Sequence, residues 1–226
     1  MSEDRSDPTE PPGAGAGPGG HVPPADLPPT ARRLLAAAQD ILAERGYAEL
    51  TMTAISQVSG VNRALVSYYF GGKAGLLAAL VDTLFQDPDV GLVEEIRATE
   101  AGAKRVESFL DWQRRVSGRD RTNRMLYELL PHALRDPEVR ARFAEEYRVY
   151  RDVDAECLSG APRELDEQEL EALAAVTIAV VEGLGIQRAL DPDGFDHEAA
   201  WRAWRDLIGS YLTLPGRPEG RDDAGA

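Results

Sequence analysis

One segment, residues 51–73, constrains the fold of this chain more than any other. Its sequence, TMTAISQVSGVNRALVSYYFGGK, predicts a short helix, a glycine turn, a second short helix and the start of a third. Thr51 is a suitable N-cap, because its hydroxyl can accept a hydrogen bond from a free backbone N–H group. Gly60 stands at the turn, where glycine tolerates the positive φ of a sharp reversal. The segment therefore predicts a helix-turn-helix unit.

The second helix of this unit is expected over Asn62–Phe70, with two distinct faces. Apolar side chains of the unit are spaced to pack inward, and they are Ile55, Val58, Val61, Leu65, Val66 and Phe70. The residues left to face outward are Asn62, Arg63, Ser67, Tyr68 and Tyr69. Their amide, guanidinium and hydroxyl groups can bond base edges and phosphates, so this helix is suited to a DNA major groove.

These residues resemble the TetR family of transcriptional regulators over about residues 31–84. The family pattern has a capping Thr, an Ile-Ala-x-x-Ala-Gly-Val turn, a helix ending in Tyr-x-His-Phe and a Lys soon after. Here the turn reads Ile55-Ser56-Gln57-Val58-Ser59-Gly60-Val61, the helix ends Ser67-Tyr68-Tyr69-Phe70, and Lys73 follows. Four residues depart from the pattern: Ser56 and Ser59 replace alanines, Ser67 replaces a tyrosine, and Tyr69 replaces the histidine.

The motif and the resemblance together give a set of candidate DNA contacts. They are Thr51, Thr53, Asn62, Arg63, Ala64, Ser67, Tyr68, Tyr69 and Lys73. Arg63 can pair with a guanine edge or a phosphate, and Lys73 begins a helix, where phosphates meet free N–H groups. Tyr68 fits a phosphate clamp or a packing aromatic, and Tyr69 is as suited to packing as to contact.

The charge balance of the whole chain opposes this assignment, but its distribution does not. The chain carries 25 Lys and Arg against 39 Asp and Glu, a net charge of −14. Residues 30–85, however, hold five basic and four acidic side chains. The motif segment is thus the part that is not acidic, and the acidic remainder can repel DNA from other faces.

Helical periodicity runs through nearly the whole chain, and no segment alternates as a strand would. The expected fold class is all-α, with an N-terminal three-helix DNA-binding head at 30–86 and a C-terminal helical body at 87–214. Proline- and glycine-rich tails are expected to be disordered at 1–29 and flexible at 215–226. Helices are expected at 30–45, 73–86, 90–99, 103–116, 120–134, 137–158, 166–190 and 196–212.

In the resembling family, the body serves dimerisation and ligand sensing. Glu182-Gly183-Leu184-Gly185 and the loop 191–196 look like the last helix–loop–helix of many members. Two glycines inside a helix cost stability, which the close approach of another helix can offset, whereas a local kink is the alternative. Trp201 and Trp204 suit core or dimer packing equally. The candidate dimer residues are Val176, Val180, Gly183, Leu184, Trp201, Trp204 and Ile208.

Aromatic side chains in the central helices can line an amphiphilic pocket, although ordinary core packing is the alternative for each. The candidate pocket residues are Trp112, Met125, Tyr127, Phe143 and Tyr147.

Other classes of protein fit the sequence poorly. The three histidines are scattered, and no metal-ligand spacing, GxxxxGK loop or GxSxG elbow is present, so we expect no enzyme, metal or cofactor. The single cysteine fits a reducing cytoplasm. The longest apolar stretch, 172–181, is too short to span a bilayer, so no membrane partner is expected.

The sequence therefore predicts a cytoplasmic, homodimeric, ligand-responsive transcriptional regulator. We expect a repressor that a small molecule releases from double-stranded DNA with a palindromic operator. The alternatives are a regulator that activates and a helical adaptor that binds only protein. The sequence names neither the effector nor the operator.

Overall fold

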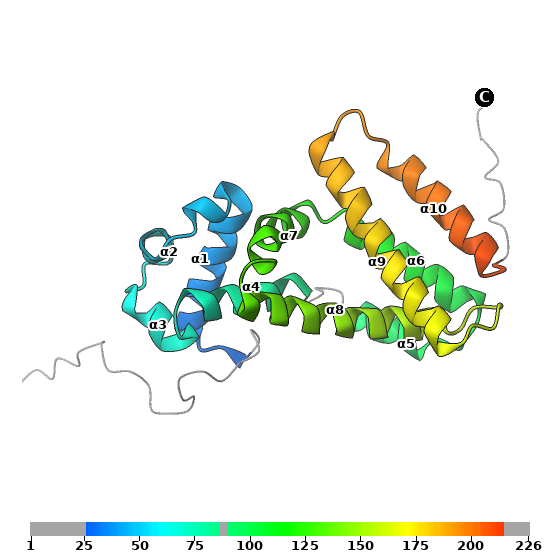
Figure 1. Ribbon diagram of the computed structural model, residues 1–226, viewed down its shortest axis with the longest axis horizontal. Coiled ribbons are helices and arrows are strands. Elements are labelled where there is room, and N and C mark those ends of the chain that lie inside the picture. The colour runs from blue at the N-terminus through cyan, green and yellow to red at the C-terminus, as the bar shows by residue number, and fades with distance from the viewer. Residues whose placement is uncertain (1–25, 86–89, 215–226) are drawn as a thin grey trace, which may run out of the picture.

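The computed structural model describes residues 26–85 and 90–214, and within these ranges the chain is helical with no strand. The expected all-α class is confirmed. Figure 1 shows an elongated molecule with the head helices α1–α4 at one end and α9 and α10 at the other. Apart from residues 26–29, the two expected tails lie outside the described residues.

The head consists of four helices and one short 3-10 turn. Their bounds are α1 Pro29–Arg45, η2 Tyr47–Glu49, α2 Met52–Ser59, α3 Ala64–Phe70 and α4 Lys73–Phe85. Pro29 starts α1, where its fixed φ and missing N–H group are harmless. Thr51 caps α2 as expected, because its Oγ1 accepts a hydrogen bond from Ala54 N at 3.1 Å. Gly60 ends α2 in the left-handed region, at φ 66°.

The head differs from the sequence prediction in two places. The recognition helix begins at Ala64 and not at Asn62, since Asn62 Oδ1 accepts a hydrogen bond from Ala64 N at 2.9 Å and shapes the turn. Val58 is 43% exposed, and Ser59 is buried in its place. The turn is tight enough that a small polar residue, and not the larger Val58, lies inside.

Within residues 90–214, the body consists of six helices. Their bounds are α5 Val90–Ala98, α6 Ala103–Ser117, α7 Asp120–Ala133, α8 Pro137–Leu158, α9 Glu167–Leu190 and α10 His197–Tyr211. Every expected body helix is present, with ends that agree to within one residue among the described residues. Aspartates fix three starts: Asp136 caps α8, Asp166 forms a capping box with Glu169 on α9, and Asp196 caps α10.

The hydrophobic core is not divided at the boundary between head and body. The first cluster of buried side chains joins Leu34, Ile41 and Val66 of the head to Met125 and Phe143 of the body. A second cluster joins α5, α6, α8 and α10, and a third joins α9 to α10. Helices α7 and α8 therefore pack directly against α1 and α4.

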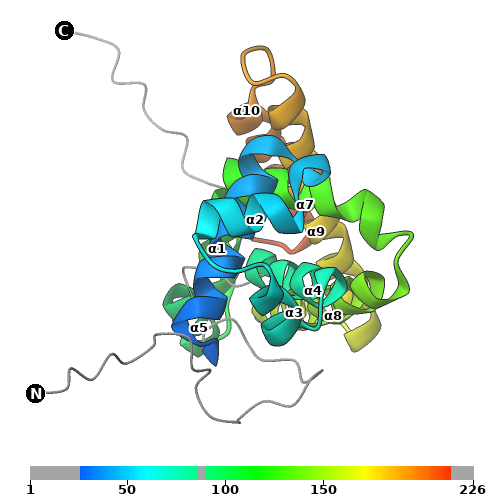
Figure 2. The ribbon, with the colours of Figure 1, turned by 90° about the vertical axis from the view of Figure 1, so that its left-hand side faces the viewer.

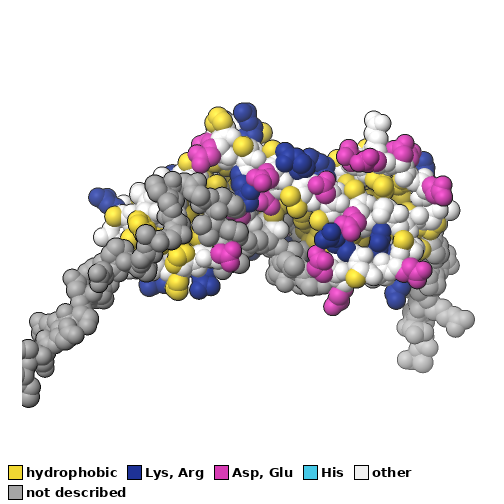
Figure 3. All heavy atoms as spheres, turned by 90° about the horizontal axis from the view of Figure 1, so that it is seen from below, with side chains coloured by type: hydrophobic (Ala, Val, Ile, Leu, Met, Phe, Trp, Pro, Cys, Tyr) yellow, Lys and Arg dark blue, Asp and Glu magenta, His cyan; other side chains and the backbone are white. Residues whose placement is uncertain are grey.

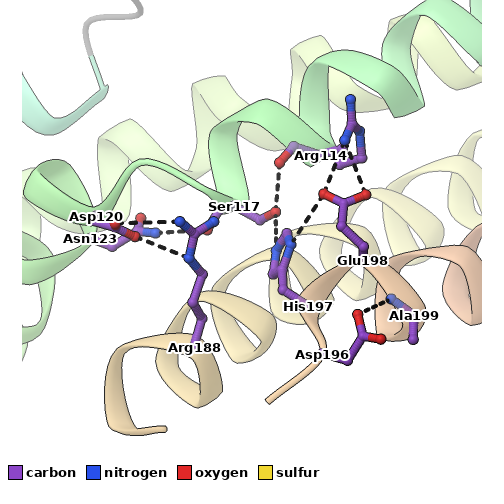
Figure 4. A network of polar contacts seen from close by, with 9 residues as sticks. All are labelled: Arg114, Ser117, Asp120, Asn123, Arg188, Asp196, His197, Glu198 and Ala199. Carbon is purple, nitrogen blue, oxygen red and sulfur yellow. Dashed lines mark hydrogen bonds and ion pairs between the residues drawn. The ribbon is translucent and has the colours of Figure 1, made fainter. Parts of the chain in front are cut away.

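Polar contacts fix the outer helices α9 and α10 to α6 and α7 (Figure 4). His197 is buried, and its Nε2 lies 2.9 Å from Ser117 Oγ. Burial lowers the pKa of His197, so the ring is neutral at this contact near neutral pH. Arg114 pairs with Glu198 at 3.0 Å, and Arg188 pairs with Asp120 at 3.4 Å.

The two glycines of α9 have different environments. A Cβ added at Gly185 would lie 2.7 Å from Tyr127 Oη and 2.9 Å from Asn123 Nδ2, so α7 of the same chain explains this glycine. A Cβ added at Gly183 would meet nothing within 4 Å. The close approach expected at this pair is therefore intramolecular at Gly185, while Gly183 faces open space.

Candidate nucleic-acid interface and central pocket

Helices α2 and α3 lie at the outer end of the head (Figure 1, Figure 2). Arg63, Ala64, Ser67 and Tyr68 are exposed at α3, and Tyr68 keeps 55% of its surface accessible. These groups form a surface with a guanidinium, two hydroxyls and a small residue between them. Such a surface can enter a groove and bond base edges or phosphates.

Serine hydroxyls hold the turn before α3. Ser56 Oγ donates to Val61 O at 2.7 Å, and Ser59 Oγ accepts from Val61 N at 3.1 Å. Arg33 of α1 donates to Ser59 O at 2.7 Å. The two serines that replace alanines of the family pattern thus add hydrogen bonds that orient α3.

The remaining candidate DNA contacts have mixed environments. Thr51, Thr53 and Asn62 are exposed, but the Thr51 hydroxyl and the Asn62 amide oxygen already serve helix starts. Tyr69 is half-buried and packs against the first cluster, with its ring edge-on to Tyr68 at 4.9 Å. Tyr69 is therefore less available to DNA than its expected outward orientation implied.

Lys73 begins α4 and is exposed. Its Nζ lies 4.6 Å from the centroid of the Tyr47 ring, a cation–π contact. Two residues later, a Cβ added at Gly75 would lie 1.8 Å from Phe70 O. Gly75 therefore lets the end of α3 lie directly against α4, which fixes the recognition helix relative to Lys73.

The charge distribution agrees with this assignment. On the face seen in Figure 3, Asp and Glu side chains gather over the body half. Within residues 30–85 of the head, five basic side chains stand against four acidic ones. A head of nearly balanced charge on an acidic body leaves the α3 surface as the place where a polyanion meets least repulsion.

A pocket lies between the head and the outer helices of the body and encloses about 630 Å³ of empty space, part of it open to solvent. Five helices and the loop after α6 supply its lining. The lining residues are Leu84, Phe85, Val116, Arg119, Thr122, Asn123, Leu126, Tyr147, Tyr150, Ile178, Val181 and Glu182. We call it the central pocket.

Among the five candidate pocket residues, only Tyr147 lines the central pocket. Trp112, Met125 and Phe143 are buried in the hydrophobic clusters and do not line this pocket. Tyr127 lies beside the pocket and donates to Glu182 O at 3.4 Å. Burial raises the pKa of Tyr127 to about 12.

One carboxyl group, that of Glu182, lines the central pocket. Glu182 Oε1 accepts a hydrogen bond from the Tyr147 hydroxyl. Burial raises the pKa of Glu182 above its usual 4.5, although the Tyr147 hydrogen bond lowers it. Burial, together with the Glu182 charge, also raises the pKa of Tyr147. An ionised Glu182 here lacks part of its hydration, so a bound cation would stabilise it.

Aromatic rings surround the same part of the pocket. The Phe85 ring lies 5.2 Å from that of Tyr147 and 5.9 Å from that of Tyr150, edge-on to both. Arg119 supplies the opposite charge among the lining residues. The sequence assigned neither Phe85 nor Glu182 to the pocket. Glu182 had a signal, because it is an acid that directly follows the most apolar stretch of the chain.

The candidate dimer residues divide into two groups. Leu184, Trp201 and Ile208 are 8%, 2% and 2% exposed, which removes them from a surface open to a partner. Trp204 and Val180 are half-buried, while Val176 is 49% exposed. The tryptophans belong to the core because α10 turns its aromatic face onto α9 and α6.

Two further observations concern the described residues alone. No group of three or more His, Cys, Asp or Glu side chains is arranged to hold a metal ion within the ranges 26–85 and 90–214. In the same ranges no single helix has the length and apolar composition to cross a bilayer, and α3 with α4 passes only as a pair bent by 63°.

The two parts of the chain match two protein families. Residues 34–80 match the family described as bacterial regulatory proteins, tetR family. Residues 102–213 match the family described as BetI-type transcriptional repressor, C-terminal. These families describe regulators and not enzymes, in agreement with the expectation from the sequence.

Individual relatives agree with this result. The regulator BetI of Rhizobium meliloti is 26% identical over 201 residues, which is 86% of this chain and 96% of that protein. BetI of Vibrio campbellii is 23% identical over 80% of this chain and 92% of that protein.

Solved structures share the fold. A regulator from Saccharomonospora viridis in complex with choline has a TM-score of 0.63 at 21% identity, covering 78% of this chain and 94% of that one. The multidrug binding protein EbrR complexed with imidazole has a TM-score of 0.59 at 24% identity, covering 87% and 100%. The chain belongs to the TetR family of transcriptional regulators, and its C-terminal domain is of the BetI type.

Proposed function

We propose that this protein is a cytoplasmic, homodimeric repressor that leaves a palindromic operator when a small organic cation enters the central pocket. The observation that carries the proposal is that α4 connects the two sites. Lys73 begins α4 beside the recognition helix, and Leu84 and Phe85 at its other end line the pocket. A ligand that displaces Phe85 therefore moves a helix that contacts α3.

Helix α4 is held against its neighbours at both ends. A displacement of Phe85 should therefore move the helix as a whole and not only bend its end. Asp82 is buried in α4 and pairs with Arg142 of α8, which also pairs with Glu145 and Glu146. At the other end, Gly75 keeps α4 against Phe70 O. Packed helices have discrete arrangements, so a shift at the pocket becomes a shift of the recognition helix.

The cation assignment follows from the side chains at the pocket. Aromatic faces and a partly desolvated carboxylate attract an organic cation, and aromatic cages are suited to quaternary ammonium groups. Two proteins of the same fold were solved with choline and with imidazole, the first a quaternary ammonium compound. Arg119 occupies the same lining, so a ligand with a polar or anionic second group is compatible with the pocket.

A second copy of the chain is the proposed partner of α9 and α10. Small and apolar side chains recur on α9 at helical spacing, and those on α10 continue the surface. The exposed members are Ala172, Ala175, Val176, Ala179, Ile186 and Leu190 on α9 with Ala203, Leu207 and Tyr211 on α10. Gly183 lies in the same row and leaves room for a partner helix. An apolar two-helix surface of this kind suits a two-fold dimer.

The test begins with DNA duplexes selected by the purified protein from a random pool. Affinity for the selected duplex is then measured by fluorescence anisotropy with choline and with 3,3-dimethylbutan-1-ol, its neutral isostere. We expect choline to weaken DNA binding and the isostere to have no effect at equal concentration. Equal responses to both compounds would refute a cation site, while enrichment of no sequence would refute operator binding.

A matched pair of variants tests Glu182. The change Glu182→Gln keeps the shape but removes the charge, and should raise the choline concentration needed for release about 10- to 100-fold. The control Glu171→Gln alters an exposed acid of the same helix and should have no effect. Because cation binding needs the ionised Glu182, choline affinity should also rise as pH increases from about 4.5 through the raised pKa.

A further inference from the structure

Helix α7 lies between the central pocket and the head, with different residues turned to each. Thr122, Asn123 and Leu126 line the pocket. Met125, Leu129 and Ala133 are buried in the first hydrophobic cluster. A third row at helical spacing consists of Arg121, Arg124, Glu128 and His132, and we call it the head-facing row. This row has no part in the function proposed above.

Each residue of the head-facing row contacts α1 or η2. Arg121 pairs with Asp40 at 2.5 Å, and Arg124 donates to Ala43 O at 3.4 Å. Glu128 Oε2 accepts a hydrogen bond from Tyr47 N at 2.8 Å. The row therefore follows the C-terminal half of α1 and ends at the short turn that leads into the helix-turn-helix unit.

Two residues of this row, Glu128 and His132, contact Tyr47. Its ring stacks on the His132 ring with centroids 3.3 Å apart and planes 18° apart. Gly46 has a φ of +81°, and a Cβ there would lie 3.1 Å from Glu128 Oε2, so glycine allows the carboxylate to reach the backbone. Backbone and side chain of Tyr47 are thus both held by α7.

The ring held in this way lies under Lys73, whose Nζ is 4.6 Å from its centroid. The charged groups around His132 are Arg135, Lys73 and Glu128, and burial together with the two cations lowers the pKa of His132. The imidazole is therefore neutral near neutral pH and does not place a second charge beside Lys73.

We propose that Tyr47 is a positioning residue for Lys73, and that Glu128 and His132 of α7 hold Tyr47 in place. The contact lets the body set the position of a DNA-binding cation directly, in addition to the path through α4. Since Thr122, Asn123 and Leu126 of the same helix line the central pocket, a bound ligand contacts the helix that holds Tyr47. The proposal rests on the proposed contact between Lys73 and a DNA phosphate.

A double-mutant cycle on the full-length protein tests this role. Lys73→Ala should weaken binding to all duplexes alike and make the slope of log affinity against log salt less negative by about 1. Tyr47→Leu should weaken binding about two- to fivefold, the range of an exposed cation–π contact, and Tyr47→Phe should restore it. In the Lys73→Ala background, Tyr47→Leu should have no further effect.

The possible results separate the two proposals. If Lys73→Ala changes neither affinity nor salt slope, the phosphate contact fails and the positioning role fails with it. If Lys73→Ala has its effect but Tyr47→Leu weakens binding equally in both backgrounds, only the positioning role is refuted. Tighter binding by Tyr47→Leu would also refute it, because Tyr47 would then hold Lys73 away from DNA.

A second variant covers the case in which Tyr47→Leu lowers the melting temperature strongly. Glu128→Ala leaves the Tyr47 side chain intact and removes the acceptor that holds its backbone. We expect Glu128→Ala to weaken DNA binding in the wild-type background. In the Lys73→Ala background, the same substitution should leave DNA binding unchanged. The exposed Glu171→Ala serves as the control, and equal losses in both backgrounds would contradict the role of Glu128.

Discussion

The head and the body of this protein are stabilised by contacts of different range. In the head, the DNA-binding surface comes from residues 51–73, and a cap, two serine hydroxyls and a glycine turn orient it over a few residues. In the body, the central pocket combines side chains from Leu84 to Glu182, which meet only after five helices have packed. A substitution in the head should therefore act mainly on the residues next to it. A substitution in the body should act also on residues that are distant in the sequence but packed against it.

The largest effect is expected from Gly75→Ala in the head. The new Cβ would lie 1.8 Å from Phe70 O, so α3 and α4 must separate. The cost of such overpacking, about 3 kcal/mol in unfolding free energy, exceeds the roughly 1 kcal/mol that alanine gains in a helix. Urea unfolding and anisotropy should show lower stability and loss of DNA binding. Wild-type stability and affinity would contradict the α3–α4 geometry.

Gly183→Leu in the body tests the opposite case, a glycine with free space around it. The stability of the single chain should not fall, because a Cβ at Gly183 meets no atom within 4 Å and leucine favours a helix more than glycine does. The dimer should weaken about tenfold or more, since the added side chain overfills the proposed interface. Light scattering over a concentration series measures this. A wild type that is monomeric at micromolar concentration would refute the α9–α10 interface.

Asp154→Asn should change how the unfolding free energy depends on pH, because Asp154 is a buried acid of the body. Asp154 is fully buried on α8, Gln113 Nε2 donates to its Oδ2 at 2.8 Å, and burial raises its pKa well above 3.8. The folded state then holds the proton more tightly, so wild-type stability falls as pH rises from 3.8 through the raised pKa, by up to about 1.4 kcal/mol per pH unit.

The variant lacks this slope, so its advantage over the wild type should grow between pH 5 and pH 8. Unfolding by urea at both pH values measures the difference. An advantage that is the same at both would show that Asp154 titrates normally.

The smallest effect is expected from Thr51→Ala, which removes the cap of α2. The loss should be about 1 kcal/mol of unfolding free energy, because Ala54 N loses its acceptor. Thr53→Ala, an exposed neighbour, is the control and should change stability very little. Equal losses from both substitutions would mean that the cap is not responsible, because alanine itself favours a helix more than threonine does.

The same difference in range explains what the sequence could predict. The cap expected at Thr51 is present, and Asp136, Asp166 and Asp196 form caps by the same kind of rule, which spans three or four residues. The turn at Gly60 follows from such a rule as well. Most helix bounds were therefore predictable, whereas the start of α3 was not, because Asn62 Oδ1 accepts a hydrogen bond from Ala64 N and shapes the turn before the helix.

The central pocket could be predicted only in part. Periodicity shows that an aromatic residue is on the apolar side of a helix, but a cavity and a solid core lie on that same side. Tyr147 and Phe143 are one turn apart on α8, yet the first lines the pocket and the second is buried. Which one borders empty space depends on Phe85 and Glu182, from two other helices.

The first hydrophobic cluster also bears on how such regulators can be recombined. Because Met125 of α7 and Phe143 of α8 complete the core of the head, a chimaera that carries only residues 26–85 onto a foreign sensory domain would leave that core open on one side. A functional exchange of operator specificity must graft either the exposed side chains of α3 alone or the head together with its supporting faces of α7 and α8. The segments that must be transferred together are therefore larger than the helix-turn-helix unit that contacts DNA.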